Sequence, residues 1–265
     1  MKKTKIYVVT HKKVDISKYH LDSVYTLIRV GNYGKEENTG LLSDRTGIQI
    51  ADKNPYYCEL TAMYWMWKND IESDIIGLCH YRRYFTKVQL SNDSRYFLTE
   101  NDIHNSLQQY DAIIPQKEYC YRGAYAGYLD CGKKNDLILT KKAIQKLYPD
   151  YIPFFESEFE FSAGNYPANM IITSKQIFDA YSKWLFDVLF YVEEHTDLTG
   201  YTAAEARIYG YISERLLGVW LAKNRVKTQC MRVVNTENPE KPLLSVAKSI
   251  GIYQLAKRCA YKLKI

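Results

Sequence analysis

Short apolar runs alternate along the chain with segments in which apolar residues recur every three or four positions. The short runs have the length and the β-branched content of buried strands. They are Lys5–Thr10, Leu27–Val30, Ile75–His80, Tyr110–Pro115, Asn169–Ile172 and Val226–Val234. Helices are expected between them, starting at Asn54 and over Asn135–Tyr148, Lys175–His195 and Ala203–Asn224. This alternation predicts an α/β fold in which helices cover a mostly parallel sheet.

Two of the helical segments carry further local signals. Asn54 suits an N-cap and Pro55 suits the first turn of the helix that follows them. The segment Ala203–Asn224 contains acidic and basic residues at spacings that allow ion pairs within one helix, and structural pairing is the simpler interpretation of them. They are Glu205, Arg207, Glu214 and Arg215.

The composition indicates one large globular unit. A chain of 265 residues with 46% hydrophobic content can bury a sizeable core. The net charge of +6 is dispersed, which disfavours a nucleic-acid-binding protein because such proteins carry a basic stripe. There is no apolar signal segment and no apolar run long enough to cross a bilayer, and the six cysteines lack C-x-x-C spacing. We expect a cytoplasmic protein with reduced thiols.

The end of the chain differs from the rest. Apolar residues recur there at helical spacing, and basic residues fall on the opposite side. The apolar set is Val246, Ile250, Tyr253, Ala256, Ala260 and Leu263, and the basic set is Lys248, Arg258 and Lys262. We expect a main domain over 1–238 and a basic amphipathic helical tail over 239–265. The tail could pack on the body, join a partner helix or touch an anionic membrane.

One strand leads directly into a cluster of polar and aromatic residues. The run Ile75–His80 is followed by Tyr81, Arg82 and Arg83. Strand ends are where α/β sheets hold ligands, and the guanidinium fork matches a phosphate. We expect an anionic ligand such as a diphosphate at this point. The alternative is that one arginine is a solvated surface charge, since successive strand residues face opposite sides.

Several blocks of the chain, in order, resemble a bacterial family of capsular, exopolysaccharide and lipopolysaccharide glycosyltransferases. The most specific blocks are E-L-T-A-M-Y-W-M-W-K-N at 59–69 and C-H-Y-R-R-Y-F at 79–85. The resemblance covers the chain up to about Asn224. It implies a nucleotide-sugar-dependent transferase with a Rossmann-like sheet of the GT-A type, and some members of the family are galactofuranosyltransferases. It also implies a UDP-sugar donor and a lipid-linked glycan acceptor, met at the inner face of the cytoplasmic membrane.

These implications assign provisional roles to residues. We place the nucleotide sugar on one group of side chains: His11, Asp44, Asn54, His80, Arg82 and Arg83. We place the acceptor near Asn169 and Arg207. Many GT-A enzymes hold a metal with an Asp-x-Asp motif, but this chain has His80-Tyr81-Arg82 at the comparable point. Fixed guanidinium groups can neutralise a departing diphosphate, so we expect metal independence. Asp44, Asp111 and His80 remain possible metal ligands.

Inverting transfer requires a general base, usually a carboxylate. Asp130 and Asp136 are the candidates because they precede or open the helix after the 110–115 strand. The alternative is that each is an ordinary loop or N-cap acid. A different function also remains open, that of a carbohydrate-binding or assembly protein without turnover. A catalyst hydrolyses its nucleotide sugar slowly and is stabilised by the nucleoside diphosphate, whereas a glycan binder responds only to glycan.

Overall fold

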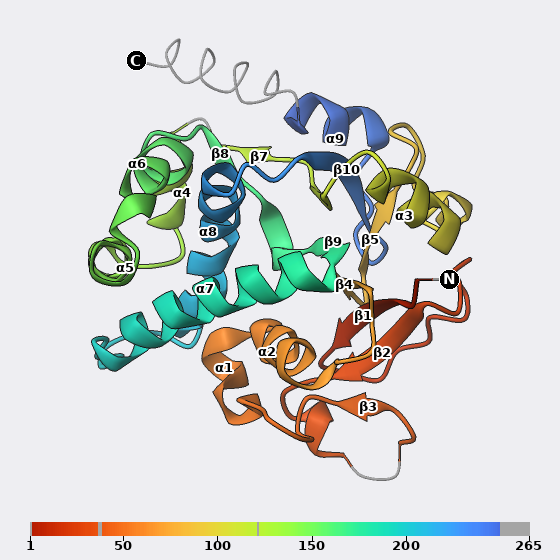
Figure 1. Ribbon diagram of the computed structural model, residues 1–265, viewed down its shortest axis with the longest axis horizontal. Helices are drawn as coiled ribbons and strands as arrows, with labels where there is room; N and C mark the ends of the chain where they lie inside the picture. Colours follow the sequence, from red (N-terminus) through yellow and green to blue (C-terminus); the bar gives the residue numbers. More distant parts are fainter. Residues whose placement is uncertain (1, 37–38, 121, 250–265) are drawn as a thin grey trace.

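The computed structural model describes residues 2–36, 39–120 and 122–249 (Figure 1). Its main feature is an eight-stranded sheet with the strand order β3-β2-β1-β4-β5-β10-β6-β9. The strands are β1 (Thr4–Thr10), β2 (Tyr25–Arg29), β3 (Leu42–Ser43), β4 (Ile75–His80), β5 (Arg83–Thr86), β6 (Ala112–Pro115), β9 (Ile171–Ser174) and β10 (Thr228–Asn235). All six predicted strands are therefore present, within a few residues of the predicted limits.

The N-terminal half of the sheet is parallel. Strands β3, β2, β1 and β4 pair in parallel register, and the central pair β1 and β4 is buried almost throughout. Alternate residues of β1 enter two different apolar clusters: Tyr7 and Val9 contact one, and Ile6 and Val8 the other. A strand buried on both faces requires an uninterrupted apolar sequence, which explains why β1 can be predicted from the sequence.

The C-terminal half is not parallel, so the expectation of a mostly parallel, Rossmann-type sheet is wrong for this part of the molecule. One edge of β4 is shared between β9, which pairs with Ile75–Leu78, and β5, which pairs at His80. Both pairings are antiparallel, as are β10 with β5 and β6 with β9. Strands β4, β5, β10, β6 and β9 thus close into a ring. The parallel pair β10 and β6 is the exception within it.

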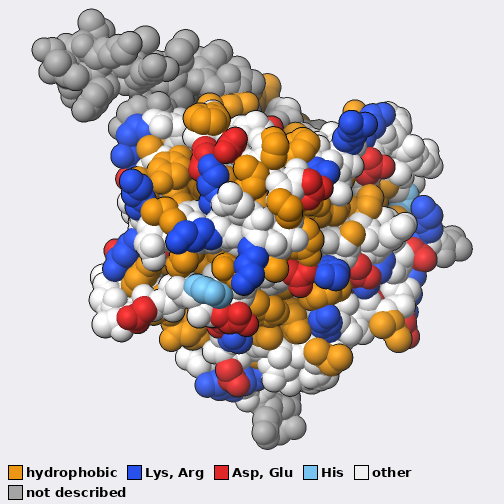
Figure 2. Space-filling view, turned by 60° about the vertical axis from the view of Figure 1, so that its left-hand side comes forward, with side chains coloured by type: hydrophobic (Ala, Val, Ile, Leu, Met, Phe, Trp, Pro, Cys, Tyr) orange, Lys and Arg blue, Asp and Glu red, His pale blue; other side chains and the backbone are white. Residues whose placement is uncertain are grey.

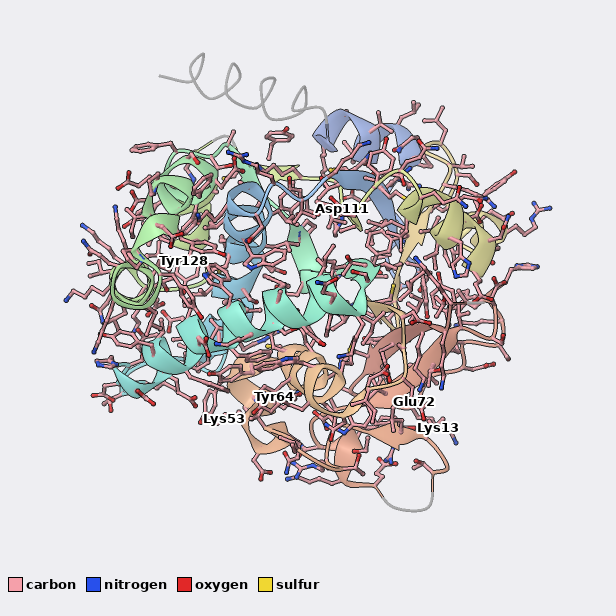
Figure 3. All side chains as sticks on the ribbon, viewed as in Figure 1. Lys13, Lys53, Tyr64, Glu72, Asp111 and Tyr128 are labelled. Atoms are coloured by element: carbon pink, nitrogen blue, oxygen red, sulfur yellow. The ribbon has the colours of Figure 1, made fainter. Side chains whose placement is uncertain are left out.

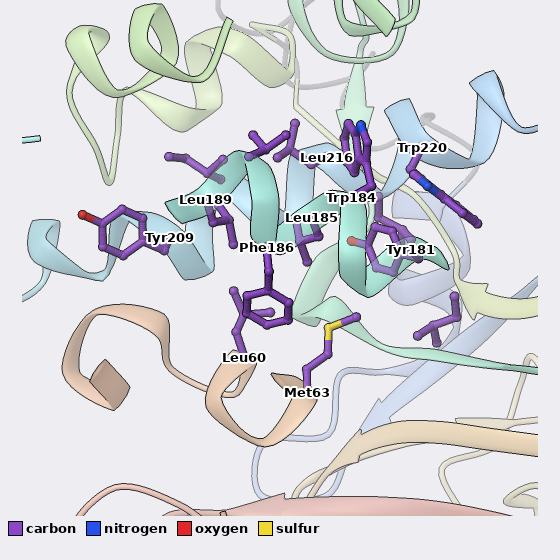
Figure 4. Close-up of a cluster of buried hydrophobic side chains, with 14 of the residues drawn as sticks. Leu60, Met63, Tyr181, Trp184, Leu185, Phe186, Leu189, Tyr209, Leu216 and Trp220 are labelled. Carbon is purple, nitrogen blue, oxygen red and sulfur yellow. The ribbon is translucent and has the colours of Figure 1, made fainter. Parts of the chain in front are cut away.

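Helices cover one side of the sheet in several layers. The long helix α7 (Lys175–Glu194) packs against α2 (Leu60–Asn69), α5 (Lys134–Leu147) and α8 (Ile208–Lys223). Figure 4 shows side chains from α2, α7 and α8, including Met63, Phe186 and Leu216, meeting in one buried cluster. The opposite side is covered by α3 (Glu100–Leu107), whose Ile103 belongs to the second cluster.

Short elements complete the chain. The helices α4 (Ala124–Tyr128) and α6 (Ile152–Phe155) lie beside α5 at the left of Figure 1. Strands β7 (Glu118–Tyr119) and β8 (Gly164–Asn165) form a separate two-stranded sheet. The predicted amphipathic helix over Ala203–Asn224 begins later, at Ile208, and is buried on nearly every side because α8 lies between other helices.

The helix predicted to start at Asn54 is two helices. The first, α1 (Asn54–Tyr57), ends at Cys58, whose φ of 52° and ψ of −129° break the helix before α2 begins at Leu60. Asn54 is not the N-cap; its Nδ2 donates to the Cys58 carbonyl at 2.7 Å and to Thr61 Oγ1 at 3.1 Å. Glu59 follows the break as the N-cap residue of α2, and its carbonyl accepts from the Met63 amide at 3.2 Å.

The predicted tail is described in part. Helix α9 (Pro242–Ser249) includes Val246 and Lys248. The remaining residues named for the amphipathic tail, from Ile250 to Leu263, lie outside the described residues. No helix within 2–36, 39–120 and 122–249 is both long and apolar enough to cross a membrane. The face shown in Figure 2 has lysine and arginine side chains dispersed among acidic and apolar ones.

Candidate functional site

A polar cleft of about 650 Å³ opens at the carboxyl ends of β1, β2 and β4. His11 follows β1, Gly31 comes shortly after β2, and the segment 80–83 connects the end of β4 to the start of β5. The opposite wall is formed by the α1–α2 junction, the start of α8 and Ala168. Adjacent parallel strands bring their carboxyl ends to one edge, so residues far apart in sequence meet here.

Six of the predicted site residues line this cleft: His11, Asn54, His80, Arg82, Arg83 and Arg207. Asn54 approaches the β2 end so closely that a Cβ on Gly31 would lie 2.6 Å from its Oδ1. Gly31 also has a φ of +62°, so both space and backbone conformation require glycine there.

The three arginines of the cleft differ in how far their charge is already neutralised. Arg82 lies 3.3 Å from a carboxylate oxygen of Glu237, which also pairs with Lys12. Arg207 donates from Nε to the Cys58 sulfur at 3.0 Å. Arg83 makes neither a hydrogen bond nor an ion pair through its guanidinium with any residue that the structure describes. Arg83 is therefore the cation most available to an anionic ligand.

His80 is a neutral positioning residue. It is 9% exposed, and burial, reinforced by the nearby Arg83 charge, lowers its pKa to about 3. Its Nε2 lies 2.7 Å from the Ala168 carbonyl oxygen, which can only accept, so Nε2 carries the proton. His80 therefore adds no positive charge to the cleft at neutral pH and instead holds the 168 backbone in place.

Two glutamates in the cleft were not among the predicted site residues. Glu59 lies at the α1–α2 break, and its Oε1 accepts from Asn169 Nδ2 at 2.8 Å. Glu214 lies on α8, where Oε1 accepts from the Ala168 amide at 2.7 Å and Oε2 from Arg215 at 3.0 Å. Burial raises the pKa of both carboxyl groups. Glu59 could have been found from the sequence, because it is the first residue of the 59–69 block. Glu214 was interpreted as one member of an ion pair within a helix.

A strained turn links these groups. Ala168 and Asn169 both have left-handed backbone angles, with φ of 66° and 51°. Such angles are unfavourable for residues with a Cβ and persist only where the surroundings hold them. Three hydrogen bonds hold the turn. His80 donates to the Ala168 carbonyl, Glu214 accepts from the Ala168 amide, and Glu59 accepts from the Asn169 side chain. Asn169 is buried behind Glu59 and is not part of the cleft wall.

The remaining predicted residues lie elsewhere. Asp44 is fully buried, and neither of its oxygens has a hydrogen-bond partner among the described residues. Burial raises its pKa to about 6. Asp111, labelled in Figure 3, accepts from the Lys227 amide at 2.8 Å and so joins the starts of β6 and β10.

The two predicted general bases are both outside the cleft. Asp136 is fully buried at the start of α5, where its carboxylate accepts from the Lys133 amide, from Tyr128 and from Tyr201. Figure 3 shows Tyr128 among the short helices, away from the strand ends. Asp130 is exposed and pairs with Arg122. The geometry therefore gives both acids the loop and helix-start roles that were the alternative interpretation.

Metal-binding potential is limited in the described part of the chain. Residues 2–36, 39–120 and 122–249 contain no group of three histidine, cysteine, aspartate or glutamate side chains placed to hold a metal ion. The cleft instead combines arginines with two carboxyl groups of raised pKa. Such a set can bind an anion and accept a proton within one site.

Comparisons with known proteins give a structural match and a family match. The fold is similar to the apo structure of WbbM, a bifunctional glycosyltransferase, with a TM-score of 0.78 and 28% identity over 89% of this chain. The similar region is 46% of that protein's chain. A search of curated sequences gives no match. Residues 5–225 match the family described as a domain of unknown function, DUF4422. The two matches confirm the family resemblance that the sequence indicates, and the chain belongs to the DUF4422 family.

Proposed function

We propose that the protein is a nucleotide-sugar-dependent glycosyltransferase that moves a hexosyl group onto a glycan. The observation that carries the proposal is the cleft itself, where Arg82 and Arg83 at a strand end face two carboxyl groups of raised pKa. The similarity to a bifunctional glycosyltransferase supports the same reaction class. Because this chain spans less than half of that protein, the assignment rests first on the cleft.

The donor is a UDP-sugar with its diphosphate on the arginines. Arg83 offers an uncommitted guanidinium, Arg82 a second one shared with Glu237, and Arg207 a third from the opposite wall. Guanidinium groups fixed on both sides of a diphosphate stabilise the charge that develops as it leaves. This proposal includes turnover without a divalent metal.

Glu214 is the general base of the proposed reaction. The acceptor hydroxyl oxygen attacks the anomeric carbon while the bond from that carbon to the diphosphate oxygen breaks, and the bonding electrons leave with UDP. The hydroxyl proton passes to the Glu214 carboxylate, and the configuration at the anomeric carbon inverts. A carboxyl group with a raised pKa accepts a proton more readily than an ordinary one. The 168 turn, held by His80, positions Glu214 through the Ala168 amide.

The wider setting follows from the family resemblance. We infer a role in bacterial capsule, exopolysaccharide or O-antigen synthesis, with a lipid-linked acceptor at the cytoplasmic face of the membrane. UDP-galactofuranose is one donor consistent with that resemblance. The fold would then be a GT-A variant in which a closed strand ring replaces the second half of the sheet.

The test is donor hydrolysis. The full chain is incubated with a panel of UDP-hexoses, including the furanose and pyranose forms of galactose, with and without EDTA, and released UDP is measured. We expect slow release from one donor, unaffected by EDTA. Failure of every donor to release UDP, together with binding of glycan alone, would instead indicate a non-catalytic carbohydrate-binding protein. Release that EDTA abolishes and manganese restores would contradict metal independence.

A further inference from the structure

A second cavity, of about 570 Å³, adjoins the first. Arg83, Ala168 and Glu214 line both, so the two cavities share a wall. Its other walls come from β8, β10, α8 and the segment that leads into α9, and include Asn165, Arg215, Arg232, Asn235, Asn238 and Glu240. A volume of this size lies in the range of small-molecule sites.

The polar character of the second cavity differs from that of the first. Among the residues that the structure describes, three arginines (Arg83, Arg215, Arg232) and three glutamates (Glu118, Glu214, Glu240) line it, so the formal charges of this lining balance. Three asparagines add groups that both donate and accept hydrogen bonds. Such a lining suits an uncharged polyhydroxylated ligand, because hydroxyl groups also donate and accept. The described lining of the first cavity has three arginines against two glutamates and so carries a formal charge of +1, which suits an anion instead.

Residues of the C-terminal segment, Glu240 and Ser245, form part of the wall of this cavity. Arg232 is 2% exposed and donates to the Ser245 hydroxyl of α9 at 3.2 Å, to the Ser91 carbonyl at 2.7 Å and to Asn92. Asn92 in turn donates to the Glu240 carbonyl at 2.9 Å. A buried guanidinium satisfied in this way fixes the wall that carries Glu240 and Ser245. The start of the predicted separate tail is therefore part of the cavity.

We propose that the second cavity binds the acceptor glycan. The inference rests on the proposed transferase function and names the place of its second substrate. Because Glu214 lies in the shared wall, a hydroxyl of a sugar in the second cavity can reach the same carboxylate that faces the donor in the first. Transfer requires this adjacency, since the attacking oxygen and the anomeric carbon must meet at about 3–3.5 Å. Arg207, predicted on the acceptor side, lines only the donor cleft of the two.

The test measures glycan binding with UDP present. Methyl glycosides of galactose, glucose, mannose and N-acetylglucosamine, and disaccharides of these, are the probes, and saturation-transfer NMR on the full chain is the readout. Asn238→Trp fills the cavity from an exposed loop, and Asn165→Ala removes an amide without adding bulk. Asn105→Trp, on an exposed position of α3 outside the cavity lining, is the matched control.

We expect saturation transfer to at least one glycoside with the wild type and the control, and at least a tenfold weaker affinity in both cavity variants. The UDP-induced rise in Tm should be the same in all four proteins, which also shows that they fold. Absence of signal for every glycoside, or an unchanged signal in both cavity variants, would overturn the inference. Absence of a UDP effect on the wild type, with glycan binding intact, would overturn the proposed function and leave the glycan site standing.

Discussion

At the scale of single residues, the cleft contains two carboxyl groups that compete for the role of base. Glu214 lines both cavities, whereas Glu59 lines only the donor cleft and accepts a hydrogen bond from Asn169. Only Glu214 is therefore accessible from the acceptor side. Its place on α8 beside Arg215 gave it the appearance of a structural ion pair, and the second contact, to the Ala168 amide, is invisible in the sequence.

We predict that Glu214→Gln lowers the transfer rate roughly 100-fold or more, since loss of a general base typically costs that much. Donor binding should survive, because the substitution keeps the size of the side chain. Glu59→Gln should lower the transfer rate less than tenfold. The measurement is kcat for transfer beside Kd for UDP in each variant. A larger loss of kcat in Glu59→Gln than in Glu214→Gln would assign the base to Glu59.

The pH dependence of transfer follows from the same group. Burial raises the pKa of Glu214, and a base must be deprotonated to act. The rate of wild-type transfer should therefore rise with pH through a midpoint above that of an ordinary glutamate. A rate profile with no acid limb above pH 4.5, the ordinary glutamate value, would contradict this role.

Asp44 should affect stability rather than catalysis. Its pKa is raised from 3.8 to about 6 by burial, so the folded state binds a proton more tightly than the unfolded state. Its contribution is thus most favourable below pH 4 and is lost as pH rises through 6. We predict that Asp44→Asn increases the free energy of unfolding by about 2 kcal/mol at pH 7.5, with little change at pH 4. Urea denaturation at both pH values measures this.

The control for that experiment is Asp52→Asn. Asp52 has an exposed side chain that pairs with Arg45, and exposed pairs contribute little. Its substitution should leave stability unchanged at both pH values. An Asp44→Asn variant that is no more stable than the wild type at pH 7.5 would show that the buried carboxyl group is compensated by interactions other than those described.

At the scale of elements, the break between α1 and α2 places Glu59 in the cleft. The sequence predicted one helix there because the apolar spacing continues through the break, and cysteine is not a residue that signals a positive φ. The strands were easier to predict, since β1 and β4 are buried on both faces and read as apolar runs. The closed ring was not predictable, because it depends on β9 and β5 sharing one edge of β4.

We predict that Cys58→Gly is more stable than Cys58→Ala by about 1 kcal/mol. Both changes remove the thiol, so the difference isolates the backbone, where glycine accepts a φ of 52° without the cost of a Cβ. Urea denaturation of the two variants gives the difference directly. Equal stability, or greater stability of the alanine variant, would mean that the break is not strained.

At the scale of the whole molecule, the C-terminal segment has two proposed roles, one in the wall of the second cavity and one in contact with anionic lipid. Its first part, α9, forms a wall of the second cavity, with Leu243 largely exposed beside it. Two of the three basic positions of the predicted amphipathic tail, Arg258 and Lys262, come after Ser249. A tail that contacts anionic lipid would bring this cavity to a lipid-linked acceptor.

We predict that truncation after Ser249 abolishes sedimentation with liposomes that contain anionic lipid. Each basic residue near such a surface contributes on the order of 1 kcal/mol, so removal of residues 250–265, with Arg258 and Lys262, should be sufficient. Donor hydrolysis should be unchanged, because α9 and both cavities are retained. Equal sedimentation of the full and truncated chains would assign the tail to packing or to a partner helix.

A thermal-shift titration with UDP measures whether the cleft at the strand ends binds a nucleoside diphosphate. Arg95 is exposed and pairs with Asp93, so Arg95→Ala serves as the control. The wild type and this control should both gain roughly 5 °C in Tm at a UDP concentration of about 100 times Kd. Arg83→Ala should lose most of that gain at the same concentration, because Arg83 is the uncommitted cation of the cleft. An Arg83→Ala variant that responds to UDP as fully as the wild type would show that the diphosphate does not bind at these strand ends through Arg83.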